Sequence, residues 1–193
     1  MKIKTTKLEG CLEIQPSIFN DERGYFFESF NLKKFESQTG QKINFVQDNE
    51  SFSTKGVLRG LHMQVGEYAQ AKLVRVLRGS VLDVVVDLRK GSPTFAEHFS
   101  INLTCENKKQ LFVPRGFAHG FVVLSDTAVF SYKCDNYYMK ESERGLIYND
   151  SELNINWQLD KENLKISKKD SVLPNLKDLV WRKVFWLLEQ TDN

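Results

Sequence analysis

The sequence predicts a mainly β protein, an antiparallel sandwich or barrel. Short apolar runs separated by turn residues recur through its middle, and strands at that spacing are typical of these two architectures. Helical periodicity is confined to two short stretches. The 193 residues, with 41% hydrophobic content, suffice for one domain with a substantial core. We therefore expect a single domain over 1–193, with a barrel core at about 40–150 and a C-terminal loop and helix at 160–193.

The expected strands are apolar runs between turn residues. Residues 72–77 lead through the Arg78-Gly79-Ser80 turn into residues 82–88. Alternation in that second run places one set of side chains on each face, with Leu82, Val84, Val86 and Leu88 on one and Asp83, Val85 and Asp87 on the other. Further strands are expected at 102–104, 111–113, 120–124 and 128–132.

The helices are expected near the two ends. Asn31 is a good N-cap and Gly40 a good C-terminal stop for a helix over 32–39. Near the C-terminus, apolar residues recur at helical spacing, namely Leu176, Leu179, Val180, Val184, Leu187 and Leu188. We expect this last helix to pack on the barrel or on a partner subunit.

Three polar side chains share faces with apolar neighbours in these strands. Lys72 is in phase with Val74 and Val76, as His119 is with Phe121 and Tyr132 with Phe130. Each could have a structural role, as a hydrogen-bonded core histidine or a lysine that reaches the rim. Together they favour a pocket, because an inward lysine needs a ligand or a counter-ion.

Charge and cysteine content limit the possible partners and compartments. The net charge of +2 gives no case for nucleic acid or a membrane surface as partner. No apolar signal core begins the sequence and no run is long enough to span a bilayer. Cys11, Cys105 and Cys134 are far apart and odd in number, which fits a reducing compartment. We expect a cytoplasmic protein.

Two of the three histidines follow turns rich in Arg and Gly. His62 stands in Arg59-Gly-Leu-His62, and His119 ends Pro114-Arg-Gly-Phe-Ala-His119. The second segment looks like the second metal-binding motif of the cupins. The His-x-His of the first motif is missing, because Met63 and Gln64 follow His62, so no bound metal is expected. Dinucleotide, Walker and Gly-x-Ser-x-Gly motifs are also absent from the sequence.

Ordered motifs from about Leu12 to Pro174 resemble those of the dTDP-4-dehydrorhamnose 3,5-epimerases. They include Asp21-Glu-Arg-Gly-Tyr-Phe-Phe-Glu28, Phe45-Val-Gln-Asp-Asn49, Val57-Leu-Arg-Gly-Leu-His62, Gln70-Ala-Lys-Leu-Val-Arg75, the segment 83–93, Pro114 through Phe121, Tyr132-Lys133, Asn136-Tyr-Tyr138 and Lys168-Lys-Asp170. The resemblance implies a cupin fold, a double-stranded β-helix or jelly-roll barrel with a few short helices. It also implies an isomerase that inverts carbons 3 and 5 of a dTDP-4-keto-6-deoxyhexose without cofactor or metal.

The resemblance implies a role for each matching residue. His62 would be the base, oriented by Asp170; Tyr132 would be the acid on the opposite face of the sugar, and Lys72 would stabilise the enolate oxygen. The implied substrate-binding residues are Arg23, Phe26, Glu28, Gln47, Asn49, Arg59, His119, Tyr138, Glu143 and Lys169. The family forms homodimers with exchanged strands, so Arg23, Phe26 and Glu28 would serve the neighbouring subunit's site.

The sequence departs from the family's pattern at Met63, where an aromatic residue is expected at the sugar end of the site. The segment from Trp181 to Asn193 matches no motif of the family. Three alternatives stay open: an epimerase that inverts carbon 3 only, a sugar-nucleotide binding module without catalysis, and a metal-dependent cupin oxygenase.

Overall fold

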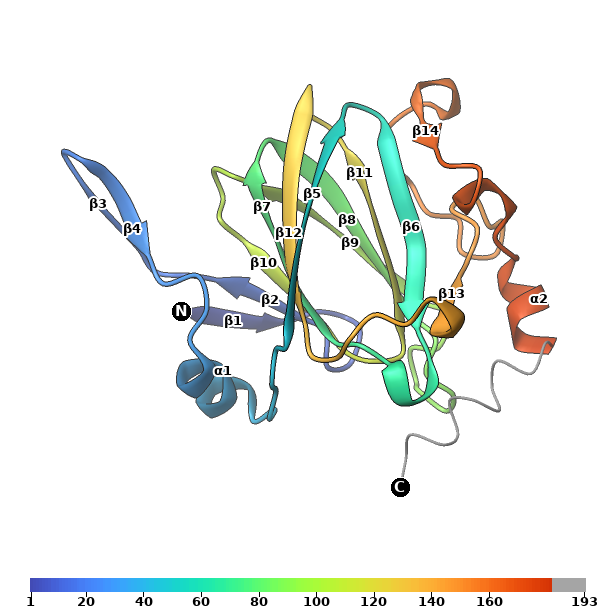
Figure 1. Cartoon of the computed structure of the whole chain (residues 1–193), viewed down its shortest axis with the longest axis horizontal. Helices are drawn as coiled ribbons and strands as arrows, with labels where there is room; N and C mark the ends of the chain where they lie inside the picture. The colour runs from blue at the N-terminus through green and yellow to red at the C-terminus, as the bar shows by residue number, and fades with distance from the viewer. Residues whose placement is uncertain (182–193) are drawn as a thin grey trace.

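Two facing β-sheets form the body of the protein, whose computed structural model describes residues 1–181 (Figure 1). In this described part the first sheet has the antiparallel order β1-β2-β10-β7-β12-β5. Its strands are β1 (Lys2–Thr5), β2 (Leu12–Gln15), β5 (Gln47–Thr54), β7 (Lys72–Arg78), β10 (Gln110–Val113) and β12 (Thr127–Cys134).

The second sheet has the order β13-β6-β11-β8-β9, with β14 paired to β6 in parallel. Its strands are β6 (Val57–Gln64), β8 (Ser80–Asp87), β9 (His98–Thr104), β11 (Phe117–Val123), β13 (Glu143–Gly145) and β14 (Lys165–Ile166). The chain crosses between the sheets through the turns β5–β6 and β7–β8. The result is a barrel of two antiparallel sheets, as the sequence predicts.

Strand β8 is buried on both faces because a separate core covers each one. Val81 and Val85 belong to a cluster with Val74 and Phe130 of the first sheet, which fills the barrel interior. The opposite face of the sheet packs under the C-terminal segment, through residues that include Leu82, Val84, Val86, Leu88, Trp157 and Leu176. The two faces predicted for residues 82–88 therefore have distinct functions: one lines the barrel and one anchors the segment that follows it.

The helices begin where the sequence predicts. Helix α1 spans Leu32–Thr39; the side chain of Asn31 accepts a hydrogen bond from the Lys34 amide, and Gly40 ends the helix with φ 71°. The C-terminal helix α2 spans Leu176–Trp181. The rest of the predicted last helix, including Val184, Leu187 and Leu188, lies outside the described residues. Within the described range, no helix is long and apolar enough to cross a membrane.

The observed strands differ from the predicted strands mainly in where they begin and end. Strand β11 begins at Phe117, three residues before the predicted start, and the strand pattern did not identify β5 or β6. His62 therefore lies within a strand rather than at its entry, directly opposite His119 of β11. Strands β1 and β2, before residue 40, also join the first sheet.

One hairpin stands away from the barrel. Strands β3 (Ile18–Asp21) and β4 (Gly24–Phe27) pair only with each other and project beyond the first sheet (Figure 1). Phe19, Tyr25 and Phe26 on this hairpin are 64%, 57% and 71% exposed. Such apolar exposure is costly in water and is typical of an interface.

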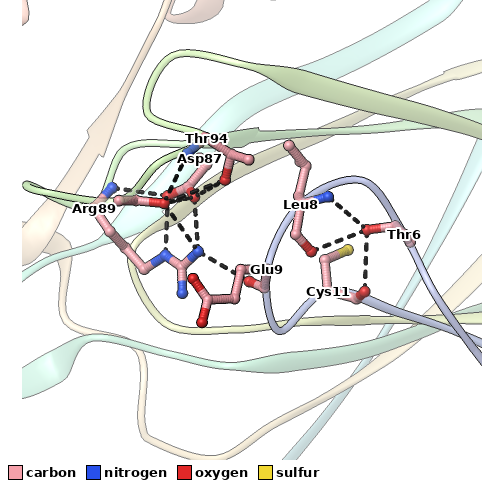
Figure 2. A network of polar contacts seen from close by, with 8 residues as sticks. Thr6, Leu8, Glu9, Cys11, Asp87, Arg89 and Thr94 are labelled. Atoms are coloured by element: carbon pink, nitrogen blue, oxygen red, sulfur yellow. Dashed lines mark hydrogen bonds and ion pairs between the residues drawn. The ribbon is translucent and has the colours of Figure 1, made fainter.

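A polar network holds the loop after β8 against the N-terminal segment (Figure 2). The buried carboxylate of Asp87 accepts hydrogen bonds from Arg89, Ser92 and Thr94, and Arg89 also donates to the Glu9 carbonyl at 2.9 Å. Burial opposes ionisation of Asp87, but these donors together lower the pKa of its carboxyl. Asp87 is therefore a fully satisfied structural carboxylate.

Candidate active site

A cavity of about 410 Å³ opens between the two sheets. Its lining includes Arg59, His62, Lys72, His119, Tyr132, Lys165, Lys169 and Asp170. A second hollow of about 320 Å³ shares His62, Lys72, Tyr132 and Lys169 with it, so the two form one cleft. Cations predominate along the cavity, which makes it suited to an anionic ligand.

A bulge in β6 lets two of the lining residues face the cavity. Arg59 pairs with Phe121 and His62 with His119, so three steps along β6 oppose two along β11. The extra residue is accommodated where Gly60 faces Gly120: a Cβ on Gly60 would lie 2.6 Å from the Gly120 Cα. Regular alternation would have placed Arg59 and His62 on opposite faces, whereas the bulge places both in the cavity.

His62 is paired with a carboxylate far away in the sequence. Its Nε2 lies 2.8 Å from Oδ1 of Asp170, and the Gly60 amide donates to the other oxygen of that carboxylate. Because an ionised carboxylate only accepts hydrogen bonds, Nε2 carries the proton and Nδ1 keeps a lone pair. Burial opposes ionisation of Asp170, but the hydrogen bonds from His62 and Gly60 lower its pKa below the ordinary value.

His119 forms a second pair of the same kind, deeper in the barrel. Its Nε2 lies 2.9 Å from Oδ2 of Asp83, and its ring stacks on Phe130 with centroids 6.0 Å apart. Asp83 is completely buried, and burial raises the pKa of its carboxyl despite the contact with His119. His119 is thus held from behind while its ring lines the cavity.

Lys72 and Tyr132 approach the cavity from the opposite sheet. Lys72 begins β7 and Tyr132 lies in β12, whereas both histidines belong to the second sheet. Burial in the barrel lowers the pKa of Lys72 and raises the pKa of Tyr132. Tyr132 therefore stays protonated at neutral pH and able to donate. A ligand between the sheets meets an imidazole on one side and a phenol with an ammonium on the other.

The second hollow contains the other polar residues that the sequence singles out. Gln47, Asn49, Tyr138, Glu143 and Lys169 all line it. Glu143 accepts hydrogen bonds from Tyr138, at 2.6 Å, and from Lys169. Burial opposes ionisation of Glu143, but these two donors lower its pKa, and the Glu143 carboxylate raises the pKa of Tyr138 to about 12.

Metal ligands do not gather in the part of the chain that the structure describes: no three His, Cys, Asp or Glu side chains are placed to hold an ion together. His62 and His119 each direct Nε2 to a separate carboxylate. His98, half-buried at the start of β9, is not in the cavity lining.

Comparison with known proteins identifies the family. The dTDP-4-dehydrorhamnose 3,5-epimerase profile matches residues 5–178. The dTDP-4-dehydrorhamnose 3,5-epimerase of Shigella flexneri is 54% identical over 170 residues, covering 88% of this chain and 93% of the relative. The chain belongs to the dTDP-4-dehydrorhamnose 3,5-epimerase family.

Solved structures of 3,5-epimerases agree with the barrel described above. The enzyme from Elizabethkingia anophelis NUHP1 is 57% identical with a TM-score of 0.90, covering 92% of this chain and 97% of that one. The enzyme from Legionella pneumophila Philadelphia 1, solved with dTDP-4-keto-L-rhamnose, is 48% identical with a TM-score of 0.87, covering 91% and 93%. The cupin jelly roll that the resemblance implies is thereby confirmed.

Three of the residues matched to the 3,5-epimerase family lie apart from the cleft. Arg23 and Phe26 belong to the projecting β3–β4 hairpin, and Glu28 follows it directly. Arg23 pairs with Asp21, and Glu28 with Lys34 of α1. Within one chain these side chains are not brought to the cavity.

Two further features of this 3,5-epimerase family member were not anticipated. Asp83 and Lys165 were not singled out, although Asp83 stands in phase with inward Val85 and Lys165 lines the cavity. Met63 is 3% exposed and packs with Leu58 and Leu61 in the core beneath the C-terminal segment. Met63 also lines the second hollow.

Proposed function

We propose that the protein converts dTDP-4-dehydro-6-deoxy-D-glucose into dTDP-4-dehydro-L-rhamnose by inverting carbons 3 and 5. The observation that carries the proposal is the placement of a base and an acid on opposite sheets, with one cavity between them. Inversion requires removal of a proton from one face of the sugar and its return to the other.

In the proposed mechanism His62 is the general base. With Nε2 bound to Asp170, Nδ1 accepts the proton from a carbon next to the ketone, and the Asp170 carboxylate stabilises the imidazolium that forms. The electron pair moves to the ketone oxygen, giving an enolate beside the Lys72 ammonium. Tyr132 returns a proton to the opposite face of the sugar, at least at carbon 5. No redox change occurs, and no cofactor is required.

The remaining cleft residues would bind the nucleotide. Arg59 is anchored through Nε to Ser53 at 3.1 Å, and its planar guanidinium suits diphosphate oxygens. Lys165 and Lys169 add positive charge along the same cavity. Gln47, Asn49 and Tyr138 in the second hollow offer amide hydrogen bonds and an aromatic face for the thymine base.

We propose that the protein works as a homodimer with exchanged strands. The projecting β3–β4 hairpin and its exposed aromatic residues support this, as does the open edge of β5 in the first sheet. Arg23, Phe26 and Glu28 would then complete the partner's site. Three free thiols support a reducing, cytoplasmic compartment.

Incubation of the enzyme and substrate in heavy water tests the function. Each inversion exchanges a carbon-bound proton with solvent, so NMR of the nucleotide sugar should show deuterium at carbons 3 and 5. Deuterium at carbon 3 alone would identify a 3-epimerase. Absence of exchange at both carbons, with bound substrate unchanged, would instead indicate a binding module.

A further inference from the structure

Asp83 is a buried carboxylate whose hydrogen bonding is incomplete. It lies in β8 with a side chain that is 0% exposed, and its Oδ2 contacts His119. Its other oxygen, Oδ1, is the one buried side-chain N or O atom without a hydrogen-bond partner in residues 1–181. Burying an unsatisfied carboxylate oxygen costs free energy, so its retention beside the cavity calls for a functional explanation.

Lys72 is the complementary case on the facing sheet. In the described part of the chain its ammonium makes no ion pair or hydrogen bond; it lies 5.8 Å from the centroid of the Tyr132 ring. Lys72 is in phase with Val74, and Asp83 is in phase with Val85, and both valines belong to the core between the sheets. Lys72 and Asp83 therefore face each other across the barrel, where the Asp83 carboxylate raises the pKa of Lys72 and Lys72 lowers the pKa of Asp83, both against the larger effect of burial.

The other charged or titratable groups around Lys72 do not replace Asp83. They are Cys134 and Tyr132 on β12, Glu143 on β13, Arg59 and His62 on β6, His119 on β11, Lys165 on β14, and Lys169 and Asp170. Glu143 is already engaged by Tyr138 and Lys169. Burial raises the pKa of the Cys134 thiol to about 11, so it is neutral. Asp170 is engaged by His62 and the Gly60 amide, so Asp83 is the carboxylate left to balance Lys72.

We propose that Asp83 is a positioning residue of the reaction centre: its carboxylate holds the His119 ring from behind and is the counter-charge that keeps Lys72 protonated when substrate displaces water from the cavity. With Nε2 of His119 held by Asp83, Nδ1 is the nitrogen left to meet the ligand. This inference rests on the proposed function for the role of Lys72, while the electrostatic coupling between Lys72 and Asp83 does not.

The pH profile of kcat/KM distinguishes this role from a structural one. In Asp83→Asn the Lys72 ammonium loses its counter-charge, so the alkaline limb should move to lower pH by about one unit, with kcat at neutral pH lower by about tenfold or more. Asp87→Asn is the matched control, because Asp87 is an equally buried carboxylate on the same strand whose partners lie outside the cavity (Figure 2). It should lower stability and leave the limb in place. An unmoved limb in Asp83→Asn, or equal movement in both variants, would overturn the proposal.

A double-mutant cycle tests the coupling without any activity. Denaturant unfolding is compared for wild type, Asp83→Asn, Lys72→Met and the double variant. If the two charges interact, the double variant should lose less free energy of unfolding than the two single variants lose together. The difference should correspond to a factor of at least about three in the unfolding equilibrium constant. Folding of the double variant when Asp83→Asn fails to fold would support the proposal equally. Additive effects, or failure of the double variant to fold, would overturn it, whereas failure of the deuterium experiment would overturn the proposed function alone.

Discussion

The protein contains two histidine–carboxylate pairs that match in geometry and differ in surroundings. His62 and Asp170 are 2.8 Å apart, and His119 and Asp83 are 2.9 Å apart, each through Nε2. The His62 side chain is 28% exposed and that of Asp170 is 5% exposed. In the deeper pair, His119 is 7% exposed and Asp83 is 0% exposed.

The surroundings give the two carboxylates opposite properties. Asp170 has a second donor in the Gly60 amide, and its hydrogen bonds outweigh burial and lower its pKa. Asp83 has one oxygen without a partner, and burial raises its pKa. Two pairs of the same residue types can thus differ in role. The His62 ring, near the solvent, can exchange protons with the substrate, whereas the buried His119–Asp83 pair positions the groups around it.

The largest expected difference between the pairs is catalytic. His62→Ala should lower kcat by about 10²–10⁴-fold, the usual contribution of a general base, while affinity for dTDP measured by calorimetry stays nearly unchanged. His119→Ala should act mainly on KM, because its ring lines the cavity without a proposed proton-transfer role. Equal losses of kcat in the two variants would show that the pairs are not functionally distinct.

The Tyr132→Phe variant tests whether a phenol on the facing sheet is the acid that complements the base His62. Loss of the phenol should reduce inversion at carbon 5 by about 10²-fold and spare deuterium exchange at carbon 3, where His62 acts directly. NMR of both carbons over a time course in heavy water measures this. If exchange at the two carbons falls together, Tyr132 is not the acid specific to carbon 5.

Arg59→Ala removes a cation from the strand that carries His62 but leaves both pairs in place. Because charged hydrogen bonds to phosphate oxygens are lost, affinity for dTDP should fall by about 10- to 100-fold. The difference from wild type should shrink as salt rises. Calorimetric titration at two salt concentrations measures both effects, and unchanged affinity would contradict the phosphate role.

The smallest expected effect is on stability. The contributions of Asp170 and Asp83 to the free energy of unfolding should change with pH in opposite directions. A lowered pKa means that Asp170 stabilises the fold above the ordinary Asp pKa of about 4 and loses this contribution as pH falls through its folded pKa. The raised pKa of Asp83 gives a contribution that is present below about pH 4 and lost as pH rises through its folded value.

Urea unfolding between about pH 3 and pH 7 compares Asp170→Asn with Asp83→Asn. As the pH falls, the free energy of unfolding should decrease less in Asp170→Asn than in wild type. In Asp83→Asn it should decrease more than in wild type. Parallel curves for the two variants would mean that the carboxylates experience the same environment.

Much of the fold could be predicted from residue patterns. Asn31 and Gly40 mark the ends of α1 correctly because capping is a local interaction. Alternation places Lys72, His119 and Tyr132 on the cavity side because strand parity is also local. Strands β5 and β6 were not predicted, and for β5 the reason is that this charged and polar edge strand lacks an apolar run.

The sequence by itself determined the mainly β class, the inward polar residues and, through its ordered motifs, the family. Only the tertiary structure decided which carboxylate meets which histidine, because Asp170 approaches His62 from 108 residues away and Asp83 approaches His119 from 36. It also decided that Arg59 and His62 share a face, since the bulge at Gly60 depends on the close approach of Gly120. Local rules set the direction of each side chain, whereas long-range packing sets its partner, its burial and therefore its charge.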